Sequence, residues 1–84
     1  MKTDIIVYTS NLCSTCQMTK EYLKLKNQSF IEKNVSTDIK AREELIEMGI
    51  DTTPLTLIGR DKIVGFNSSK IDNAIDQLLW FFGI

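Results

Sequence analysis

The chain has 84 residues, of which 43% are hydrophobic and 25% charged, with a formal net charge of −1 at pH 7. This length predicts one domain, residues 1–84, near the lower size at which a chain folds alone, and the near-neutral charge predicts no nucleic-acid or membrane partner. The sequence has no histidine, which excludes Cys–His catalysis and histidine-ligated metal sites.

The apolar segments near the two ends are short. Residues 5–7 are far shorter than the apolar region of a signal peptide, and residues 78–82 are too few to span a bilayer. We therefore expect a cytoplasmic protein, a setting in which lasting disulfides are rare and transient catalytic ones are the usual exception.

The first half of the chain predicts two strands that alternate with two helices. Residues 4–9 predict a strand that is apolar on both faces and therefore central in its sheet. A helix is expected over residues 13–26, followed by a second strand over residues 29–35. Ser36 or Thr37 is expected to cap a second helix, which Gly49 ends.

The second half predicts a hairpin and a final helix. Residues 55–58 and 63–66 are expected to be strands joined by a four-residue loop, residues 59–62. Ser68 or Ser69 is expected to cap the last helix, and its apolar residues recur at helical spacing, namely Ile71, Ala74, Ile75, Leu78, Leu79 and Phe82. The predicted order is β-α-β-α-β-β-α, an α/β fold.

Both cysteines lie in one motif, Cys13-Ser14-Thr15-Cys16, between the first strand and the first helix. That context is typical of a redox-active pair. Residues three apart on a helical turn have Cβ atoms roughly 5–6 Å apart, which is near the separation that a disulfide accepts. Because the ring is small, the bond is a weak crosslink and is better suited to being made and broken.

The position of each cysteine predicts its role. Cys13 is expected at the helix N-terminus, where unpaired N–H groups and the helix dipole favour a thiolate. Cys16 is expected inside the first turn and less exposed. We therefore assign Cys13 as the attacking nucleophile and Cys16 as the thiol that resolves the mixed disulfide.

Three motifs together resemble a known family: Val7-Tyr8-Thr9 before the cysteine motif, Thr52-Thr53-Pro54 before the third strand, and Gly65-Phe66 after the fourth. The chain resembles the glutaredoxins, and more closely the NrdH-type redoxins, small electron donors of ribonucleotide reductase. The resemblance implies a minimal thioredoxin fold, a four-stranded mixed sheet with three helices, in agreement with the order predicted above.

The resemblance also implies where a substrate binds. Thr53–Pro54 is expected to be a cis peptide beside the sulfurs, with the Thr53 backbone pairing with an extended substrate segment. Phe66 is expected either to supply apolar surface at the rim or to be an ordinary core aromatic. The substrate-binding residues implied in this way are Tyr8, Ser10, Leu12, Ser14, Thr15, Thr53, Pro54, Gly65 and Phe66.

The sequence also departs from the family pattern. Glutaredoxins usually carry a lysine where this chain has Ser10 and a proline where it has Ser14, and residues 65–68 lack the second glycine and the acid that help to hold glutathione. We therefore expect thioredoxin reductase, not glutathione, to supply electrons. Without that lysine, the helix terminus is the only thiolate stabiliser that the sequence predicts, and the pKa of Cys13 is expected to be lowered less than in a lysine-containing relative.

Four alternatives remain open. The protein could be a glutathione-dependent glutaredoxin, or a regulator of the Spx and arsenate-reductase-like group, which the residues before the cysteine motif also resemble. A dimer could pool Cys13 and Cys16 from two chains around zinc or an iron–sulfur cluster. Residues 80–82 could form a docking or dimer surface. The expected protein is a monomer with no metal and no prosthetic group, and its expected substrate is a protein disulfide, with ribonucleotide reductase as the candidate.

Overall fold

The computed structural model describes the backbone of residues 5–83 and the side chains of residues 5–77. Predictions about Asp4, and about the side chains of residues 78–83, lie outside that range. The elements are β1 (Ile5–Thr9), α1 (Ser14–Leu25), β2 (Ile31–Asn34), α2 (Ile39–Glu47), β3 (Leu55–Ile58), β4 (Asp61–Val64) and α3 (Ser68–Gly83). This order confirms the predicted fold class. No helix in the described part of the chain is long and apolar enough to cross a membrane.

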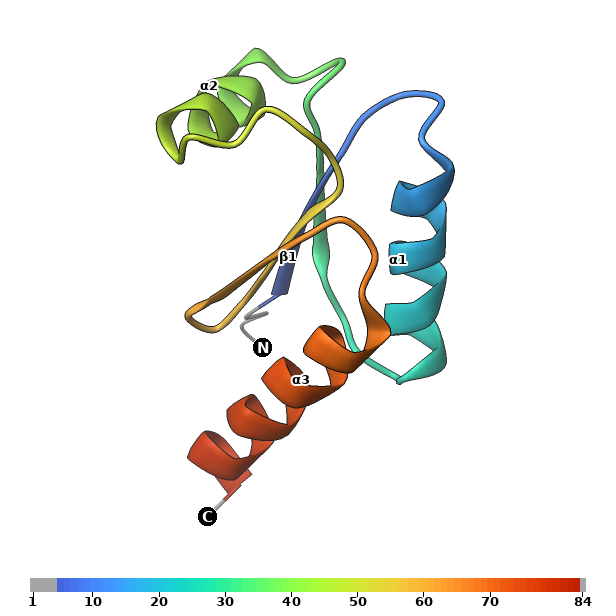
Figure 1. Ribbon diagram of the computed structural model, residues 1–84, viewed down its shortest axis with the longest axis vertical. Helices are drawn as coiled ribbons and strands as arrows, with labels where there is room; N and C mark the ends of the chain where they lie inside the picture. The colour runs from blue at the N-terminus through green and yellow to red at the C-terminus, as the bar shows by residue number, and fades with distance from the viewer. Residues whose placement is uncertain (1–4, 84) are drawn as a thin grey trace.

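The four strands form one mixed sheet in the order β2-β1-β3-β4. β1 pairs parallel with β2, aligning Val7 with Glu32, and antiparallel with β3, aligning Tyr8 with Leu55. β3 pairs antiparallel with β4. β1 is therefore a central strand, as its apolar sequence predicts, and its carboxyl end leads directly into the loop that carries the cysteines (Figure 1).

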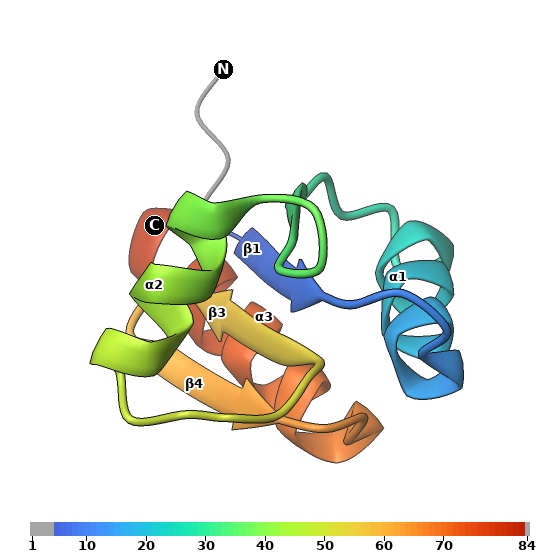
Figure 2. The same ribbon diagram turned by 90° about the horizontal axis from the view of Figure 1, so that it is seen from above.

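The helices cover both faces of the sheet. α1 and α3 lie on one face and α2 on the other (Figures 1 and 2). Side chains of β1 alternate between them: Ile5 and Val7 belong to the core cluster under α1 and α3, whereas Tyr8 packs with Ala41 and Leu45 under α2.

Leu23 of helix α1 is fully buried in the core cluster that also contains Ile5 and Val7 of β1. Truncating such a side chain to alanine costs about 2–5 kcal/mol. Since α1 begins with the cysteine motif, this packing also fixes the position of the motif relative to β1.

Two helix caps differ from the sequence-based expectation. Asp38 caps α2, because its side chain accepts hydrogen bonds from the backbone N–H of Lys40 and Ala41 at 3.0 and 3.2 Å, so the prediction of Ser36 or Thr37 is wrong. For α3, Asn67 Oδ1 accepts from Lys70 N at 3.1 Å. In both cases the backbone path into the helix places the Asx residue, and not a nearby serine or threonine, directly before the first helical residue.

The hairpin is tighter and β2 is shorter than predicted. Ile58 pairs with Asp61, so the loop is Gly59-Arg60 and the prediction of four residues is wrong. Gly59 has a φ of 58°, a conformation suited to the first position of a two-residue turn. Asp61 and Lys62 extend β4 because their exposed side chains cost nothing at an edge strand.

Candidate active site

The two cysteines form a disulfide at the start of α1, with Cα atoms 5.2 Å apart, which confirms the predicted pair. Cys13 is the N-cap of α1, in an extended conformation with φ −118°. Its Sγ accepts a hydrogen bond from Cys16 N at 3.1 Å. The first turn of the helix therefore directs a backbone donor at this sulfur, where it favours a negative charge.

The two sulfurs differ in exposure. Cys13 is half-buried, whereas Cys16 is 1% exposed. A sulfur atom of another molecule can therefore reach Cys13 and not Cys16. This asymmetry supports the predicted division into an attacking and a resolving cysteine.

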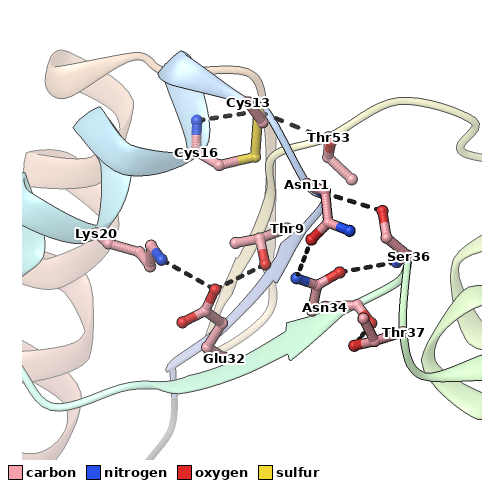
Figure 3. Close-up of polar contacts among 10 residues, drawn as sticks. All are labelled: Thr9, Asn11, Cys13, Cys16, Lys20, Glu32, Asn34, Ser36, Thr37 and Thr53. Atoms are coloured by element: carbon pink, nitrogen blue, oxygen red, sulfur yellow. Dashed lines mark hydrogen bonds and ion pairs between the residues drawn. A yellow bond between two sulfur atoms is a disulfide. The ribbon is translucent and has the colours of Figure 1, made fainter.

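The loop before β3 lies against Cys13. Thr53–Pro54 is a cis peptide bond, as the resemblance implies, and Pro54 is buried. Thr53 Oγ1 donates to Cys13 Sγ across 3.9 Å (Figure 3). Thr53 Oγ1 also lies 2.6 Å from Ser10 Oγ, and Gly65 N donates to Pro54 O at 2.8 Å.

A cavity of about 540 Å³ opens beside the disulfide. Its lining includes residues 9–14, Cys16, Gln17, Lys20, Glu32 and Asn34. The structure thus brings together the predicted residues Ser10, Leu12 and Ser14 around the cysteines. Leu12 has a φ of 56° and a fully exposed side chain, so it projects away from the protein directly before the nucleophile.

Three other predicted substrate-binding residues, Tyr8, Thr15 and Phe66, do not line this cavity. Tyr8 is 3% exposed and donates its hydroxyl to Glu44 Oε1 on the α2 face at 2.8 Å, so its side chain is a core residue outside the cavity. Thr15 lies at 3.4 Å from Cys13 Sγ through its hydroxyl. Phe66 packs edge-on against Tyr22, with ring centroids 5.7 Å apart, which favours the core-aromatic interpretation.

The cavity also contains a charged pair, Lys20 and Glu32, that the sequence motifs do not predict. Lys20 Nζ and Thr9 Oγ1 both donate to Glu32 Oε2, at 3.0 and 2.8 Å (Figure 3). Partial desolvation raises the pKa of Glu32, but the hydrogen bonds from Lys20 and Thr9 lower it more, and the net pKa lies below its usual value. Glu32 was missed because only the pairing of β2 with β1 brings it near the motif.

A polar network fixes the cysteine loop to the start of α2. Asn11 N donates to Ser36 Oγ at 3.0 Å, and Asn34 Nδ2 donates to Asn11 Oδ1 at 3.1 Å (Figure 3). Ser36 N in turn donates to Asn34 Oδ1 at 2.8 Å. Ser36 thus orders the loop before Cys13 instead of capping a helix. Within the described residues, no group of three metal-ligating side chains occurs.

Comparison with known proteins gives consistent matches. The family model for glutaredoxin matches residues 5–63. An uncharacterized glutaredoxin-like 8.6 kDa protein in a rubredoxin operon of Clostridium pasteurianum is 40% identical over 74 residues, which cover 87% of this chain and 99% of that protein. The glutaredoxin-like protein NrdH of Lactococcus lactis subsp. cremoris is 30% identical over 67 residues, covering 80% and 93%.

Solved structures agree with these sequence matches. The NrdH-redoxin of Escherichia coli superposes with a TM-score of 0.77 and 29% identity, covering 82% of this chain and 91% of that one.

The global transcriptional regulator Spx 1 of Oceanobacillus iheyensis is 30% identical in sequence over 77 residues, which cover 88% of this chain but only 56% of the regulator. The regulator is thus the longer chain.

Proposed function

Because this chain belongs to the glutaredoxin family, we propose that it is a dithiol–disulfide oxidoreductase that reduces disulfide bonds of partner proteins. The observation that carries the proposal is the disulfide between a half-buried Cys13 and a fully buried Cys16. A lasting structural crosslink gains little from so short a loop, whereas a redox pair needs one accessible sulfur and one protected sulfur.

The reaction runs from the reduced form of the pair. The Cys13 thiolate attacks one sulfur of the partner disulfide, and the other partner sulfur leaves as a thiolate. Cys16 then attacks Cys13 Sγ, and its proton goes to the sulfur that departs. The cysteines end as the observed disulfide, and the partner gains two electrons and two protons, one from the Cys16 thiol and one from solvent, which had taken up the proton of Cys13 when that thiol ionised.

A protein partner suits the surface around Cys13. The exposed Leu12 offers an apolar contact directly beside the nucleophile, and the Thr53 backbone offers an edge on which an extended segment can pair. We propose that the partner presents its disulfide on such a segment. Ribonucleotide reductase is the candidate substrate, on the strength of the similarity to NrdH proteins.

The charges of the cavity favour a protein as electron source over glutathione. Glutathione carries two carboxylates, which need cationic partners. Lys20 and Glu32, the charged side chains among the residues that line the cavity, are paired with each other at 3.0 Å, and position 10 carries a serine. We therefore propose thioredoxin reductase as the electron donor of a cytoplasmic, monomeric redoxin that needs no prosthetic group.

A reductant-choice assay tests this proposal. The oxidised protein is offered NADPH with thioredoxin reductase, and separately glutathione with glutathione reductase and NADPH, while NADPH consumption is followed. We expect sustained turnover only with thioredoxin reductase when a disulfide substrate is present. The Cys16→Ser variant is the control, since it can form a mixed disulfide through Cys13 but cannot resolve it.

Two other outcomes would contradict the proposal. Turnover with glutathione alone would establish a glutathione-dependent glutaredoxin and overturn the proposed electron source. Turnover with neither reductant, despite an intact Cys13–Cys16 disulfide, would overturn the reductase proposal itself. The next hypotheses would then be regulation of the Spx kind and a dimer that binds a metal or cluster through its cysteines. An iron–sulfur cluster would be detected by the visible absorbance of freshly purified protein.

A further inference from the structure

We propose that Ser10 and Thr53 form a hydroxyl relay that stabilises the Cys13 thiolate in the reduced protein. Thr53 donates the hydrogen bond to the sulfur, and Ser10 is a positioning residue that orients the Thr53 hydroxyl. The inference rests on the proposed function, because a thiolate at Cys13 matters only if this cysteine attacks a disulfide. It assigns to the two side chains a role separate from substrate binding.

The distances support a relay with one direction. Ser10 Oγ lies 2.6 Å from Thr53 Oγ1, and Thr53 Oγ1 lies 3.9 Å from Cys13 Sγ. Each hydroxyl has a single proton to donate. If Thr53 uses its proton for the sulfur, then Ser10 must supply the proton between the two oxygens. The sequence of donors is therefore Ser10 to Thr53 to Cys13.

This arrangement stabilises charge at the sulfur in two ways. A hydrogen bond to the ionised form of a group lowers its pKa, and a donor that itself accepts a hydrogen bond is polarised into a stronger donor. Thr53 therefore acts on the sulfur directly, and Ser10 acts only through Thr53. Both side chains are half-buried, so water competes for these hydrogen bonds less than at the open surface.

The other hydrogen-bonding groups close to Cys13 Sγ are also uncharged. Cys16 N and the Thr15 hydroxyl also lie within hydrogen-bonding distance of Cys13 Sγ, at 3.1 and 3.4 Å. Among the described side chains, no lysine or arginine donates to this sulfur. The charged groups that line the cavity are Lys20 and Glu32, which form an ion pair with each other. Asp51 lies on the same loop as Thr53, and its side chain is exposed to solvent.

The test is a thiolate titration in the Cys16→Ser background, where Cys13 is the sole thiol. Thiolate is followed by ultraviolet absorbance and, independently, by the rate of alkylation with iodoacetamide as a function of pH. We expect Thr53→Val to lower the acid dissociation constant of Cys13 about five- to tenfold. Thr53→Ser restores the hydroxyl and is expected to restore most of the effect. Ser10→Ala is expected to lower the constant about two- to threefold.

The double variant separates a relay from two independent contacts. Because Ser10 acts through Thr53, adding Ser10→Ala to Thr53→Val is expected to cause no further change. Thr52→Val is the matched control, since Thr52 is an exposed neighbouring threonine that is expected to leave the titration unchanged. Thermal unfolding of every variant verifies that it folds.

Two results would overturn the relay. One is an unchanged titration in a folded Thr53→Val variant, and the other is a full Ser10→Ala effect that persists when Thr53 is valine. Neither result touches the reductase proposal, which the turnover of the unaltered protein with thioredoxin reductase tests separately. Conversely, a protein without turnover but with the expected titrations would keep the relay and lose the proposed function.

Discussion

Two polar groups of the same chemical composition lie on opposite faces of the sheet. Each joins a hydroxyl, a carboxylate and a lysine. On the α2 face, the Tyr8 hydroxyl donates to Glu44 Oε1 at 2.8 Å, and Lys33 Nζ donates to the same oxygen at 3.0 Å. Lys33 also lies over the Tyr8 ring, 5.7 Å from its centroid. This group, the Tyr8 cluster, fastens α2 to the sheet.

The second group, the Thr9 cluster, lies on the α1 face one residue further along β1. Thr9 and Lys20 donate to Glu32 at the same distances, 2.8 and 3.0 Å. Here the carboxylate lines the cavity beside Cys16. The two clusters have nearly the same hydrogen-bond geometry but different surroundings. Their distance from the disulfide, and not their local hydrogen bonding, therefore decides which of them can influence the redox site.

The largest expected contrast concerns the sulfur itself. Cys13→Ser is expected to lower the rate of disulfide reduction by on the order of 10³-fold or more, since it removes the nucleophile. Tyr8→Phe, on the opposite face, is expected to keep at least half of the wild-type rate. Both rates are measured with NADPH, thioredoxin reductase and a protein disulfide. A large loss in Tyr8→Phe would contradict the structural assignment of the Tyr8 cluster.

The second contrast appears at alkaline pH. Burial and the hydrogen bond to Glu44 raise the pKa of Tyr8 to about 12, above its ordinary value near 10. In this range the unfolded chain loses the phenol proton before the folded protein does, so stability falls as the pH rises from about 10 to about 12. At about 1.4 kcal/mol for each pKa unit, the whole shift corresponds to about 3 kcal/mol. Roughly 2 kcal/mol of this is expected to be lost within this pH range, because the unfolded chain is already half ionised at its start and the folded protein only half ionised at its end.

Urea unfolding at a series of alkaline pH values measures this loss. In Tyr8→Phe the loss is expected to shrink, leaving a smaller part from Tyr22, whose pKa the hydrogen bond to Asp72 also raises. Thr9→Val is expected to keep the full loss, because threonine does not ionise. Equal alkaline losses in Tyr8→Phe and the unaltered protein would show that another group dominates.

A third contrast compares the hydroxyls at pH 7. Tyr8→Phe and Thr9→Val each remove one hydrogen bond to a carboxylate, and each is expected to lower the free energy of unfolding by about 1 kcal/mol. Only Thr9→Val is expected to make the reduction potential of the disulfide more negative, because it leaves more uncompensated negative charge beside Cys16. Redox titration against glutathione buffers measures the reduction potential of each variant. An equal shift of the potential in Tyr8→Phe and Thr9→Val would show that the two clusters do not differ in their influence on the disulfide.

The smallest expected effects come from the two lysines. Lys20→Met and Lys33→Met each remove a partly exposed ion pair, so each is expected to cost less than about 1 kcal/mol. Lys20→Met alone is expected to lower the thiolate fraction of Cys13, about twofold at low ionic strength and less in 0.5 M salt, where screening weakens the unpaired Glu32. If Lys33→Met lowered the thiolate fraction of Cys13 as much as Lys20→Met does, the Thr9 cluster would have no greater influence on the sulfur than the Tyr8 cluster.

Local patterns predicted much of this protein. Three features depend only on neighbours along the chain: the continuous apolar run of β1, the helical spacing of Ile71, Ala74 and Ile75, and the two cysteines three residues apart. The hairpin loop was predicted too long, because the polar Asp61 and Lys62 belong to an edge strand. The helix caps were predicted wrongly, because several polar side chains lie close to each helix start. Which of them reaches a free N–H depends on the backbone path into each helix.

Neighbouring residues along the chain are enough to predict the order of the elements, the mixed α/β fold and the paired cysteines at a helix start. The side chains that surround those sulfurs come together only through long-range packing. Thr53 lies 40 residues beyond Cys13, and Glu32 reaches the cavity through the pairing of β2 with β1. A shift of one residue in strand register moves every side chain to the other face, and such registers are set by long-range packing. Tyr8 and Thr9 illustrate this dependence. They are adjacent in β1 and point to opposite faces of the sheet, so Tyr8 lies in the core under α2 and Thr9 lines the redox cavity.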